Sequence, residues 1–503
     1  ATLAVAIFLW ESYHFVPQAD DAFISYRYAA NLLHAHELVF NIGEYVEGYT
    51  NLLWTLLIAL GMALGLEAPT VGYILSAAFG GALLLAVYFY TLEFLPRSRR
   101  WLAGVAPLCL LSFNSFACWT SSGLETPLFA FLVVLAFHAF YRRQIFWVMA
   151  LCILATLTRP EGAILALFLL GSDFLTRTIE RGRVDIGLTI RDSVPSLCYA
   201  GYIAAHTIFR IYYYGDPLPN TFYAKVGDIS IGWGWLYLRN FLVDGPALLI
   251  PGSIIAAFSV RAFRLPALYV LATAAYVVWI GGDVFRLGRF MLPVLPFMVT
   301  GAIVAISLLS DTNRAIAVAF GFLVVLSTWT SLYGTWPGSI DFANATQTEF
   351  LVSKKRTSAR DHLFHSGEDA NVRRVITAIE SFTPPATLVA SVGIGRLGYF
   401  SGTLPILDLV GLVDRHIAHS GRFIANTLRL PGHFRTDSDY VLSRKPDVIL
   451  IPMIGNPAVK VLIPAIADLW KNPRLEQEYY WDAQHRFYRI KPEFARTAGS
   501  TGM

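Results

Sequence analysis

The chain has 503 residues, of which 55% are hydrophobic and 15% are charged, and its formal net charge is +4. Soluble domains usually contain about 25% charged residues, so this composition argues against an ordinary soluble protein. The small net charge, with no dense basic block, gives no support for a nucleic-acid partner. Long apolar runs recur through residue 333, and they predict that most of the chain lies in a membrane.

Some of the loops between the apolar runs are basic, and these loops predict how the chain is oriented in the membrane. Short basic loops tend to stay in the cytoplasm, so we place the N-terminus and loops 97–100, 141–143, 177–191, 260–264 and 311–314 there. Segment 50–66 is short for a span of roughly 20 residues, so we expect an interfacial or re-entrant helix. About eleven transmembrane helices then remain. They are the first run and 69–95, 101–117, 126–141, 144–158, 161–176, 195–212, 244–261, 265–280, 290–309 and 315–333.

The composition changes after residue 333. Charges and prolines increase, and short strand-like runs occur at 386–392, 404–410 and 446–452, with a helical pattern at 369–382. We therefore predict two domains, a transmembrane domain at 1–333 and a soluble α/β domain at 334–503. The second is large enough for a core of its own, and the orientation above places it outside the cytoplasm.

The predicted outer loops contain nearly all the unusual polar residues of the membrane portion. Ionisable groups near a membrane are costly, so they usually face a cavity and act there. This pattern predicts a functional site on the extracytoplasmic side. Its acidic and basic candidates are Asp20, Asp21, Glu44, Glu47, Glu125, Arg159, Glu161, Asp216, Lys225, Asp283, Arg286 and Arg289.

The first outer segment, PQADDAFISYRYAANLL, places Asp20 and Asp21 side by side after an apolar run. Adjacent helical residues point about 100° apart, so the two carboxylates do not serve one point equally. One interpretation makes one of them a general base for an acceptor hydroxyl. The alternative is helix capping, which stabilises by roughly 1 kcal/mol but requires only one aspartate.

Several cations in the same loops could bind a phosphate. They are Arg27, Arg159, Lys225, Arg286 and Arg289. Arginine binds phosphate through two parallel hydrogen bonds and lysine binds it as a point charge. The alternative is that these side chains reach the lipid headgroups, but positive charge is normally scarce on the outer face. Aromatic residues also crowd these loops, and most of them fit an interfacial aromatic belt.

The stretch GIGRLG at 393–398 matches a dinucleotide-binding glycine pattern. It lies in the part of the chain predicted to be extracytoplasmic, and no acidic residue follows in the expected context. We therefore interpret it as a turn from a strand into a helix. The sequence contains no metal-binding signature; a divalent ion at Asp20 and Asp21 has no other support.

The ordered motifs resemble the GT-C class of polyprenyl-phosphate-sugar-dependent glycosyltransferases. More narrowly, they resemble the mycobacterial terminal β-arabinofuranosyltransferase and its bacterial relatives. The matching stretches are ADD at 19–21, VFNIGEYVEGYTN at 39–51, TSSGLET at 120–126, TRPE at 158–161, YYGDPLPNTFYAK at 213–225, GGDVFRLGRFMLP at 281–293 and DLVGLVDRHIAH at 408–419.

The resemblance implies a multi-pass enzyme of the cell membrane whose site faces outward. The donor would be a polyprenyl-phosphate-linked sugar, arabinofuranose, and the acceptor a hydroxyl of an extracytoplasmic arabinan-like glycan. An aspartate of the first outer loop would be the catalytic base, with Asp20 first and Asp21 second. The matching motifs also contribute substrate-binding candidates, namely Glu47, Asn51, Glu125, Glu161, Tyr223 and Asp283.

No cofactor is required by this interpretation, because arginine and lysine can neutralise the leaving phosphate. Two variants of the chemistry stay open: another lipid-linked sugar, or a protein acceptor such as pilin. A transporter or flippase is a further alternative. Transporters carry charges near the bilayer midplane and often show internal repeats, whereas these charges gather at loop edges. A non-catalytic membrane anchor would not need acids and cations in several separate loops.

Overall fold

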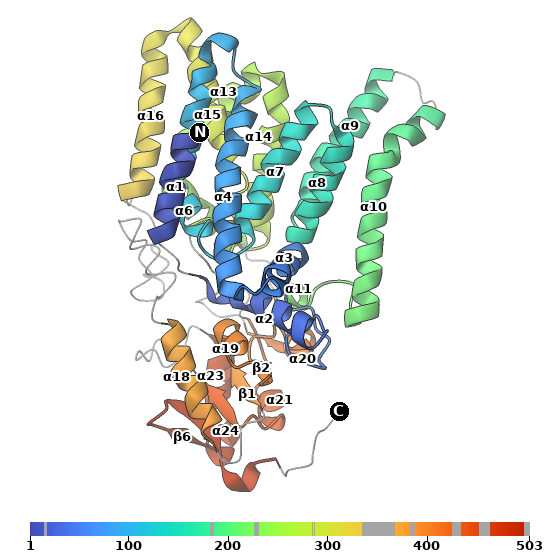
Figure 1. The fold of residues 1–503 in the computed structure, drawn as a ribbon, viewed down its shortest axis with the longest axis vertical. Helices are drawn as coiled ribbons and strands as arrows, with labels where there is room; N and C mark the ends of the chain where they lie inside the picture. The colour runs from blue at the N-terminus through green and yellow to red at the C-terminus, as the bar shows by residue number, and fades with distance from the viewer. Residues whose placement is uncertain are drawn as a thin grey trace.

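The computed structural model describes residues 1–14, 18–181, 186–225, 231–283, 285, 287–333, 368–382, 388–424, 434–451 and 463–496. Figure 1 shows two parts, a bundle of long helices and, at one end of it, a smaller part that contains the strands. We call the smaller part, residues 368–496, the α/β unit. The predicted boundary at 333–334 borders residues outside the described ranges and stays a prediction.

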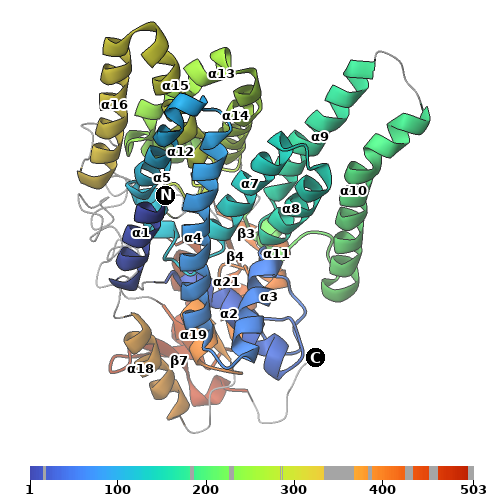
Figure 2. The same cartoon turned by 45° about the horizontal axis from the view of Figure 1, so that its top comes forward.

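The helical part runs from the N-terminus to residue 333. Its elements are α1 (Thr2–His14), α2 (Asp20–His34), α3 (Leu52–Ala63), α4 (Ala68–Leu92), η1 (Arg97–Gly104), α5 (Val105–Leu111), α6 (Asn114–Trp119), α7 (Thr126–Tyr141), α8 (Ile145–Thr158), α9 (Gly162–Arg181), α10 (Ile186–Tyr214), α11 (Asn220–Lys225), α12 (Ile231–Val243), η2 (Pro246–Leu249), α13 (Ile250–Ser259), η3 (Arg261–Phe263), α14 (Arg264–Trp279), η4 (Arg289–Met291), α15 (Leu295–Thr312) and α16 (Arg314–Tyr333). In Figures 1 and 2, α9 and α10 project away from the other helices.

Several helices are apolar and long enough to cross a membrane, so the chain is a multi-pass membrane protein. Within the described residues there are five, Ala68–Leu92, Gly162–Ile179, Arg261–Trp279, Leu295–Thr312 and Arg314–Ser331, and a sixth if the bent pair Ile231–Val243 and Pro246–Ser259 is one span. Four shorter apolar helices include Thr126–Tyr141 and Ile145–Thr158. The expected number of about eleven spans therefore stays a prediction.

Two predicted spans are not single straight helices. The run 101–117 is not one helix: α5 ends at Leu111, Phe113 has an extended backbone, and α6 follows. The backbone N–H of Asn114 at this break donates to Ser331 Oγ of α16 at 3.0 Å, so a distant helix satisfies the break. The run 244–261 follows a helix that we did not predict, α12, and the two axes meet at 76°. Gly245 at the bend has φ +116°, a conformation that favours glycine.

The short segment 50–66 forms α3, which has 12 residues and packs against α2 and α4. Its length agrees with the prediction that this segment does not cross the membrane.

The basic loops gather at the end of the bundle opposite the α/β unit (Figure 1). Arg99 forms an ion pair with Asp311, and Arg142 lies 2.7 Å from Glu93. The hydroxyl of Tyr141 donates to the carbonyl of Ala262 at 2.5 Å. These contacts join four of the five predicted cytoplasmic loops, as the orientation argument requires of loops on one side.

The α/β unit contains a five-stranded sheet with the order β2-β1-β5-β7-β6. Strands β1 (Val389–Ser391), β2 (Ile406–Asp408) and β5 (Val448–Leu450) are parallel, and the hairpin β6 (Tyr479–Asp482) and β7 (Phe487–Ile490) joins antiparallel to β5. A separate pair joins β3 (Arg422–Phe423) and β4 (Arg435–Thr436). The described helices are α18 (Glu368–Glu380), α19 (Gly395–Phe400), α20 (Arg415–Ser420), α21 (Ser438–Ser443), α23 (Pro464–Lys471) and α24 (Pro473–Glu478), with η5 (Pro492–Phe494).

The three predicted strand-like runs are confirmed as β1, β2 and β5, and the predicted helix 369–382 is α18. The edge hairpin β6–β7 was not predicted. Its strands have four residues each and mixed burial, so they lack the apolar run that marks a central strand.

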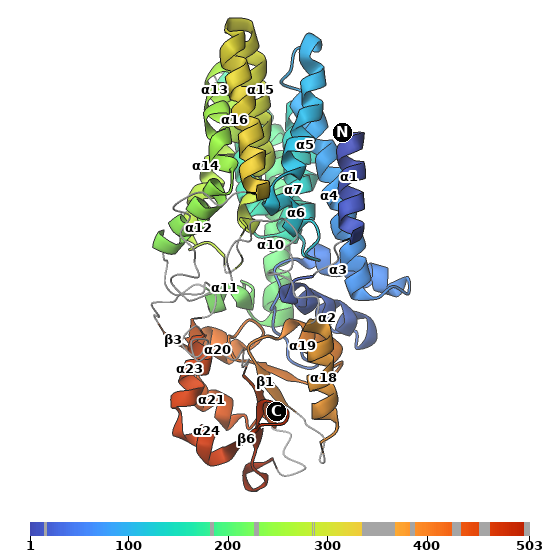
Figure 3. The ribbon, with the colours of Figure 1, turned by 90° about the vertical axis from the view of Figure 1, so that its left-hand side faces the viewer.

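Helix α2 connects the two parts. Phe23 and Tyr26 pack in the core of the bundle, whereas Ile24 and Tyr28 share a second core with Val389 and other residues of the α/β unit. Figure 3 shows α2 between the long helices above it and α19 below it. Side chains on both sides of one helix are buried, and the two parts therefore meet along α2.

Candidate functional site

The two aspartates at the start of α2 face different surroundings. The electrostatic neighbours of the Asp21 carboxylate are Arg289, Lys225, Asp20 and Asp283. Burial raises the pKa of Asp21 most strongly; the two cations lower it and the two acids raise it further, so the pKa lies above its ordinary value. Asp21 thus combines a partly buried carboxylate with cationic electrostatic neighbours from α11 and η4.

Asp20 instead contacts the α/β unit. Its Oδ2 accepts a hydrogen bond from the N–H of Gly395 at 3.1 Å, and its Oδ1 accepts one from the N–H of Arg396 at 2.9 Å. The guanidinium of Arg396 lies 3.7 Å away. Both carboxylate oxygens of Asp20 are therefore engaged at the start of α19, whereas Asp21 has cations as its electrostatic neighbours. The expectation that Asp20 is the first choice for the base stays a prediction.

Arg27 also has a structural role, contrary to the expectation that it binds substrate. Its side chain is 1% exposed. Its Nε donates to the carbonyl of Phe40 at 2.6 Å, and its Nη2 donates to that of Leu404 at 2.9 Å; Nη1 donates to Gly398. These backbone partners come from both parts of the chain, so Arg27 holds α2 against the α/β unit and is not free for a phosphate.

The stretch GIGRLG is the turn between β1 and α19, as predicted. A Cβ at Gly395 would lie 1.9 Å from the carbonyl oxygen of Asp20, and one at Gly398 would lie 2.5 Å from the ring of Phe40. These glycines permit close packing on α2, which explains the pattern without a dinucleotide.

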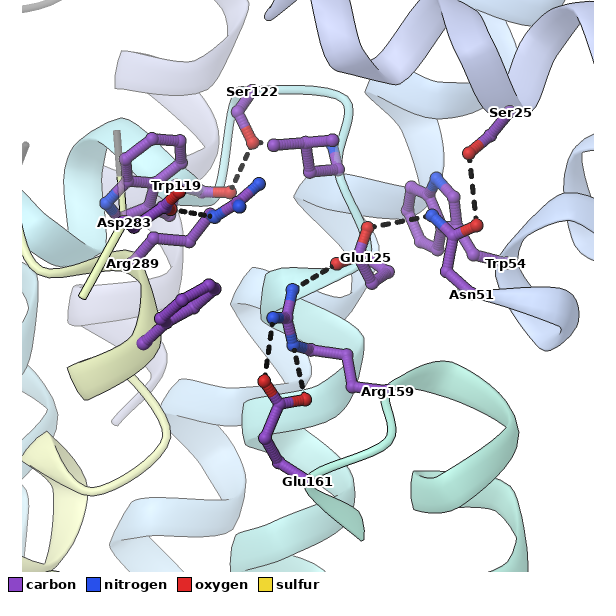
Figure 4. A network of polar contacts seen from close by, with 12 residues as sticks. Ser25, Asn51, Trp54, Trp119, Ser122, Glu125, Arg159, Glu161, Asp283 and Arg289 are labelled. Atoms are coloured by element: carbon purple, nitrogen blue, oxygen red, sulfur yellow. Dashed lines mark hydrogen bonds and ion pairs between the residues drawn. The ribbon is translucent and has the colours of Figure 1, made fainter. Parts of the chain in front are cut away.

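A buried polar chain links α2, α3, α7 and α8 (Figure 4). Ser25 Oγ donates to Asn51 Oδ1 at 3.1 Å, and Asn51 Nδ2 donates to Glu125 Oε2 at 2.9 Å. The other oxygen of Glu125 lies 2.5 Å from Arg159 Nη1. Arg159 also forms an ion pair with Glu161 at 3.1 Å. Four predicted site residues are thus joined in one network.

The charges within this network are mutually stabilised. Burial alone would raise the pKa of Glu125, but Arg159, Arg289 and the hydrogen bond from Asn51 hold it below its ordinary value. Burial would lower the pKa of Arg159, but Glu161 and Glu125 raise it above its ordinary value. Both groups therefore stay ionised, and Arg159 is held in a fixed orientation.

Arg289 is the second buried cation. Its Nε lies 2.7 Å from Asp283 Oδ2, and both side chains are at most 7% exposed. Its guanidinium carbon lies 5.0 to 5.8 Å from the ring centroids of Phe285, Phe290 and Trp119. In Figure 4 its terminal nitrogens point away from Asp283. Arg286, another predicted residue, lies outside the described residues.

Arg159 and Arg289 line one pocket. Its other polar lining groups are Glu161, Thr126, Thr273, Tyr269 and Tyr276. The buried hydroxyl oxygen of Thr126 has no hydrogen-bond partner among the described residues. This combination of two cations with hydroxyl groups suits a phosphate that carries a sugar.

The remaining predicted residues lie near the base of α10 and in α11. Glu47 is 3% exposed and forms a 2.8 Å ion pair with Arg210; burial raises its pKa to about 7, although Arg210 opposes the shift. The ring of Tyr223 stacks on His419 with centroids 4.1 Å apart. Lys225 is exposed and makes no ion pair with any residue that the structure describes. Glu47 is thus already paired, whereas Lys225 can meet a ligand.

Two residues of this region were missed from the sequence. Asn220 donates from Nδ2 to the carbonyls of Gly411 and Leu412, and so ties α11 to the DLVGLVD loop. Arg396 lies inside GIGRLG, where a basic residue at a helix start was the available signal. No group of three or more His, Cys, Asp or Glu in the described ranges could hold a metal ion.

Residues 361–497 match a family model described as a domain of unknown function (DUF8728). The chain is 28% identical over 260 residues to a terminal beta-(1->2)-arabinofuranosyltransferase of Mycobacterium tuberculosis, a match that covers 48% of this chain and 40% of the relative. The protein of the same name from Corynebacterium glutamicum is 25% identical over 386 residues, covering 65% and 54%. The chain spans about half the length of these curated relatives.

Among solved structures, the fold is similar to ArnT from Cupriavidus metallidurans bound to undecaprenyl phosphate. The TM-score is 0.54, the identity is 12%, and the match covers 99% of both chains. ArnT is a glycosyltransferase of the GT-C fold. The similarity extends over the helical part and the α/β unit together, and the chain therefore has the fold of the GT-C membrane glycosyltransferases.

Proposed function

We propose that this chain is a membrane glycosyltransferase that moves arabinofuranose from a polyprenyl-phosphate donor to a hydroxyl of an extracytoplasmic, arabinan-like glycan. The observation that carries the proposal is Asp21, a partly buried carboxylate with Arg289 and Lys225 as electrostatic neighbours. A general base and phosphate-binding cations are the two requirements of this transfer. The named relatives and the shared fold support a lipid-linked donor.

In the proposed reaction, an acceptor hydroxyl attacks C1 of the donor sugar and Asp21 accepts its proton. The bond between C1 and the phosphate oxygen breaks, the new glycosidic bond forms, and polyprenyl phosphate leaves. Arg289 and Lys225 neutralise the charge that develops on the phosphate. Arg159, held by Glu125 and Glu161, orients the donor in the pocket that it lines with Arg289.

The proposed orientation places the site and the α/β unit on the extracytoplasmic side of the cell membrane. The basic loops joined at the far end of the bundle support it, because short basic loops favour the cytoplasm. The α/β unit then covers the site from the side on which a soluble glycan arrives.

The test is transfer by the purified full chain in nanodiscs. Synthetic polyprenyl-phosphates that carry arabinofuranose, another pentose or a hexose would be offered with short arabinan acceptors and with a pilin peptide. We expect product from the arabinofuranose donor and arabinan. Product from a different donor would mean that the transferred sugar is not arabinofuranose. Product only on the pilin peptide would mean that the acceptor is a protein. Failure of every donor to bind would overturn the proposal.

A further inference from the structure

Arg396 of the α/β unit contacts α2 on both sides of Asp21. It lies at the second position of α19 and is 5% exposed. Its Nη2 donates to the carbonyl of Gln18 at 2.5 Å, and its Nη1 lies 3.7 Å from Asp20 Oδ1. Its guanidinium carbon is 4.6 Å from the centroid of the Phe23 ring. One side chain therefore touches residues before and after the proposed base.

The backbone at the start of α19 adds to this contact. The N–H groups of Gly395 and Arg396 bind the Asp20 carboxylate. The absence of a side chain at Gly395 lets α19 approach the α2 backbone, because a Cβ there would lie 1.9 Å from the carbonyl oxygen of Asp20. The first turn of α2 is thus fixed from the α/β unit, through neighbours of Asp21 and not through Asp21 itself.

Arg396 is in turn held by α18. Its Nε lies 2.6 Å from Asp369 Oδ1. The planar guanidinium can therefore serve Asp369, Asp20 and the Gln18 carbonyl together, and it stacks on Phe23. A lysine ammonium is a point charge without this fixed fork, so it could replace only part of the set.

We propose that Arg396 is a positioning residue, through which the α/β unit fixes the first turn of α2 and directs the Asp21 carboxylate at the acceptor hydroxyl. This inference rests on the proposed function, in which Asp21 is the base. A base must lie within hydrogen-bond reach of the proton that it takes, and a misplacement of about 1 Å can lower a rate about 100-fold.

The experiment measures kcat, the KM for donor and the pH dependence of kcat for R396A and R396K in nanodiscs. We expect R396A to lower kcat about 10- to 100-fold while the donor KM stays within about twofold, because the phosphate contacts are elsewhere. The acidic limb of its pH profile should move to higher pH. The reason is that Asp20 loses its cationic partner in this variant, so its uncompensated negative charge raises the pKa of the neighbouring Asp21 further. R396K should recover part of kcat.

The matched control is R474A. Arg474 is an arginine of the same unit that pairs with Glu478 four residues on, and its side chain is 36% exposed. It should keep the wild-type kcat and pH profile. If R396A does not fold, R396Q replaces it: this variant removes the charge of Arg396 but keeps a polar side chain, so kcat should fall and the acidic limb should again move to higher pH.

Two results would overturn the inference. One is a wild-type kcat in R396A, or in R396Q where that variant has replaced it. The other is a fall in kcat of the same variant with an unchanged pH profile, as an interface of purely structural role would give. Failure of the underlying function looks different, because wild type would then bind no donor and show no transfer, and failure of the base assignment alone would leave transfer intact in D21N.

Discussion

At the scale of single residues, two adjacent aspartates have different surroundings. The helix turns about 100° between Asp20 and Asp21, so one reaches α19 and the other faces the cations of α11 and η4. The sequence indicated that Asp20 was surplus to helix capping, and the resemblance made Asp20 the first candidate for the base and Asp21 the second. The deciding contact joins residues 375 positions apart, which no local pattern reveals.

The raised pKa of Asp21 predicts opposite pH effects on activity and stability. Transfer needs the ionised base, so activity should be lost as pH falls through this raised pKa. The folded state binds the Asp21 proton more tightly than the unfolded state, so the contribution of Asp21 to stability is greatest below the ordinary pKa of an aspartate and is lost as pH rises from there through the raised pKa. D21N removes the charge whose burial is unfavourable, so this variant should melt at a higher temperature than wild type at neutral pH.

The control for this prediction is D20N, measured in the same thermal unfolding series. Asp20 accepts two backbone hydrogen bonds and faces Arg396, so its loss should lower the melting temperature. A lower melting temperature for D21N would show that the Asp21 charge stabilises the fold.

At the scale of elements, close packing between α2 and α19 defines the junction. The glycine pattern predicted a turn, and the structure explains the glycines by what lies against them. The breaks at Phe113 and Gly245 could not be predicted, because they depend on distant partners. Asn114 binds Ser331, and a Cβ at Gly245 would lie 2.4 Å from the carbonyl oxygen of Ser327.

The glycines of the turn can be tested as a matched set. G395A and G398A place a methyl group 1.9 Å from Asp20 and 2.5 Å from Phe40, respectively. Each should loosen the α/β unit, giving faster limited proteolysis and a lower melting temperature. G393A is the control, because nothing lies within 4 Å of its Cβ position. Equal behaviour of the three variants would refute this account of the pattern.

The ion pair that joins α7 and α8 predicts a large stability effect. R159A leaves the buried Glu125 and the partly buried Glu161 without their ion-pair partner, which should cost about 3–5 kcal/mol. R142A removes a pair whose arginine is 58% exposed, and should cost about 1 kcal/mol or less. The two variants would be compared by unfolding in detergent. A loss in R159A no larger than that in R142A would mean that the network contributes little.

At the scale of the whole molecule, the membrane part and the α/β unit meet along α2, which carries the proposed base. Apolar runs and strand-like runs in the sequence were enough to predict both parts and three of the strands. The sequence did not reveal the contact between them, since α2 has buried side chains on both sides and its partners come from opposite ends of the chain.

The proposed orientation predicts which positions are reachable from outside the cell. A cysteine introduced at Arg142 should be labelled only after the membrane is opened, whereas one at Arg474 should be labelled in intact cells. Each cysteine would be introduced into a variant that lacks the native cysteines, of which Cys109, Cys118 and Cys152 are buried and Cys198 is exposed. The reverse labelling pattern would invert the topology.

The central claim is that Asp21 is the base and Asp20 a structural residue. It is tested most directly by transfer from polyprenyl-phospho-arabinofuranose to an arabinan acceptor, with donor binding measured in parallel, for wild type, D21N and D20N. We predict that D21N binds donor but loses about 100-fold or more in kcat, within the range of general-base catalysis, and that D20N keeps a larger share of its activity. Near-normal transfer by D21N together with loss in D20N would contradict the account.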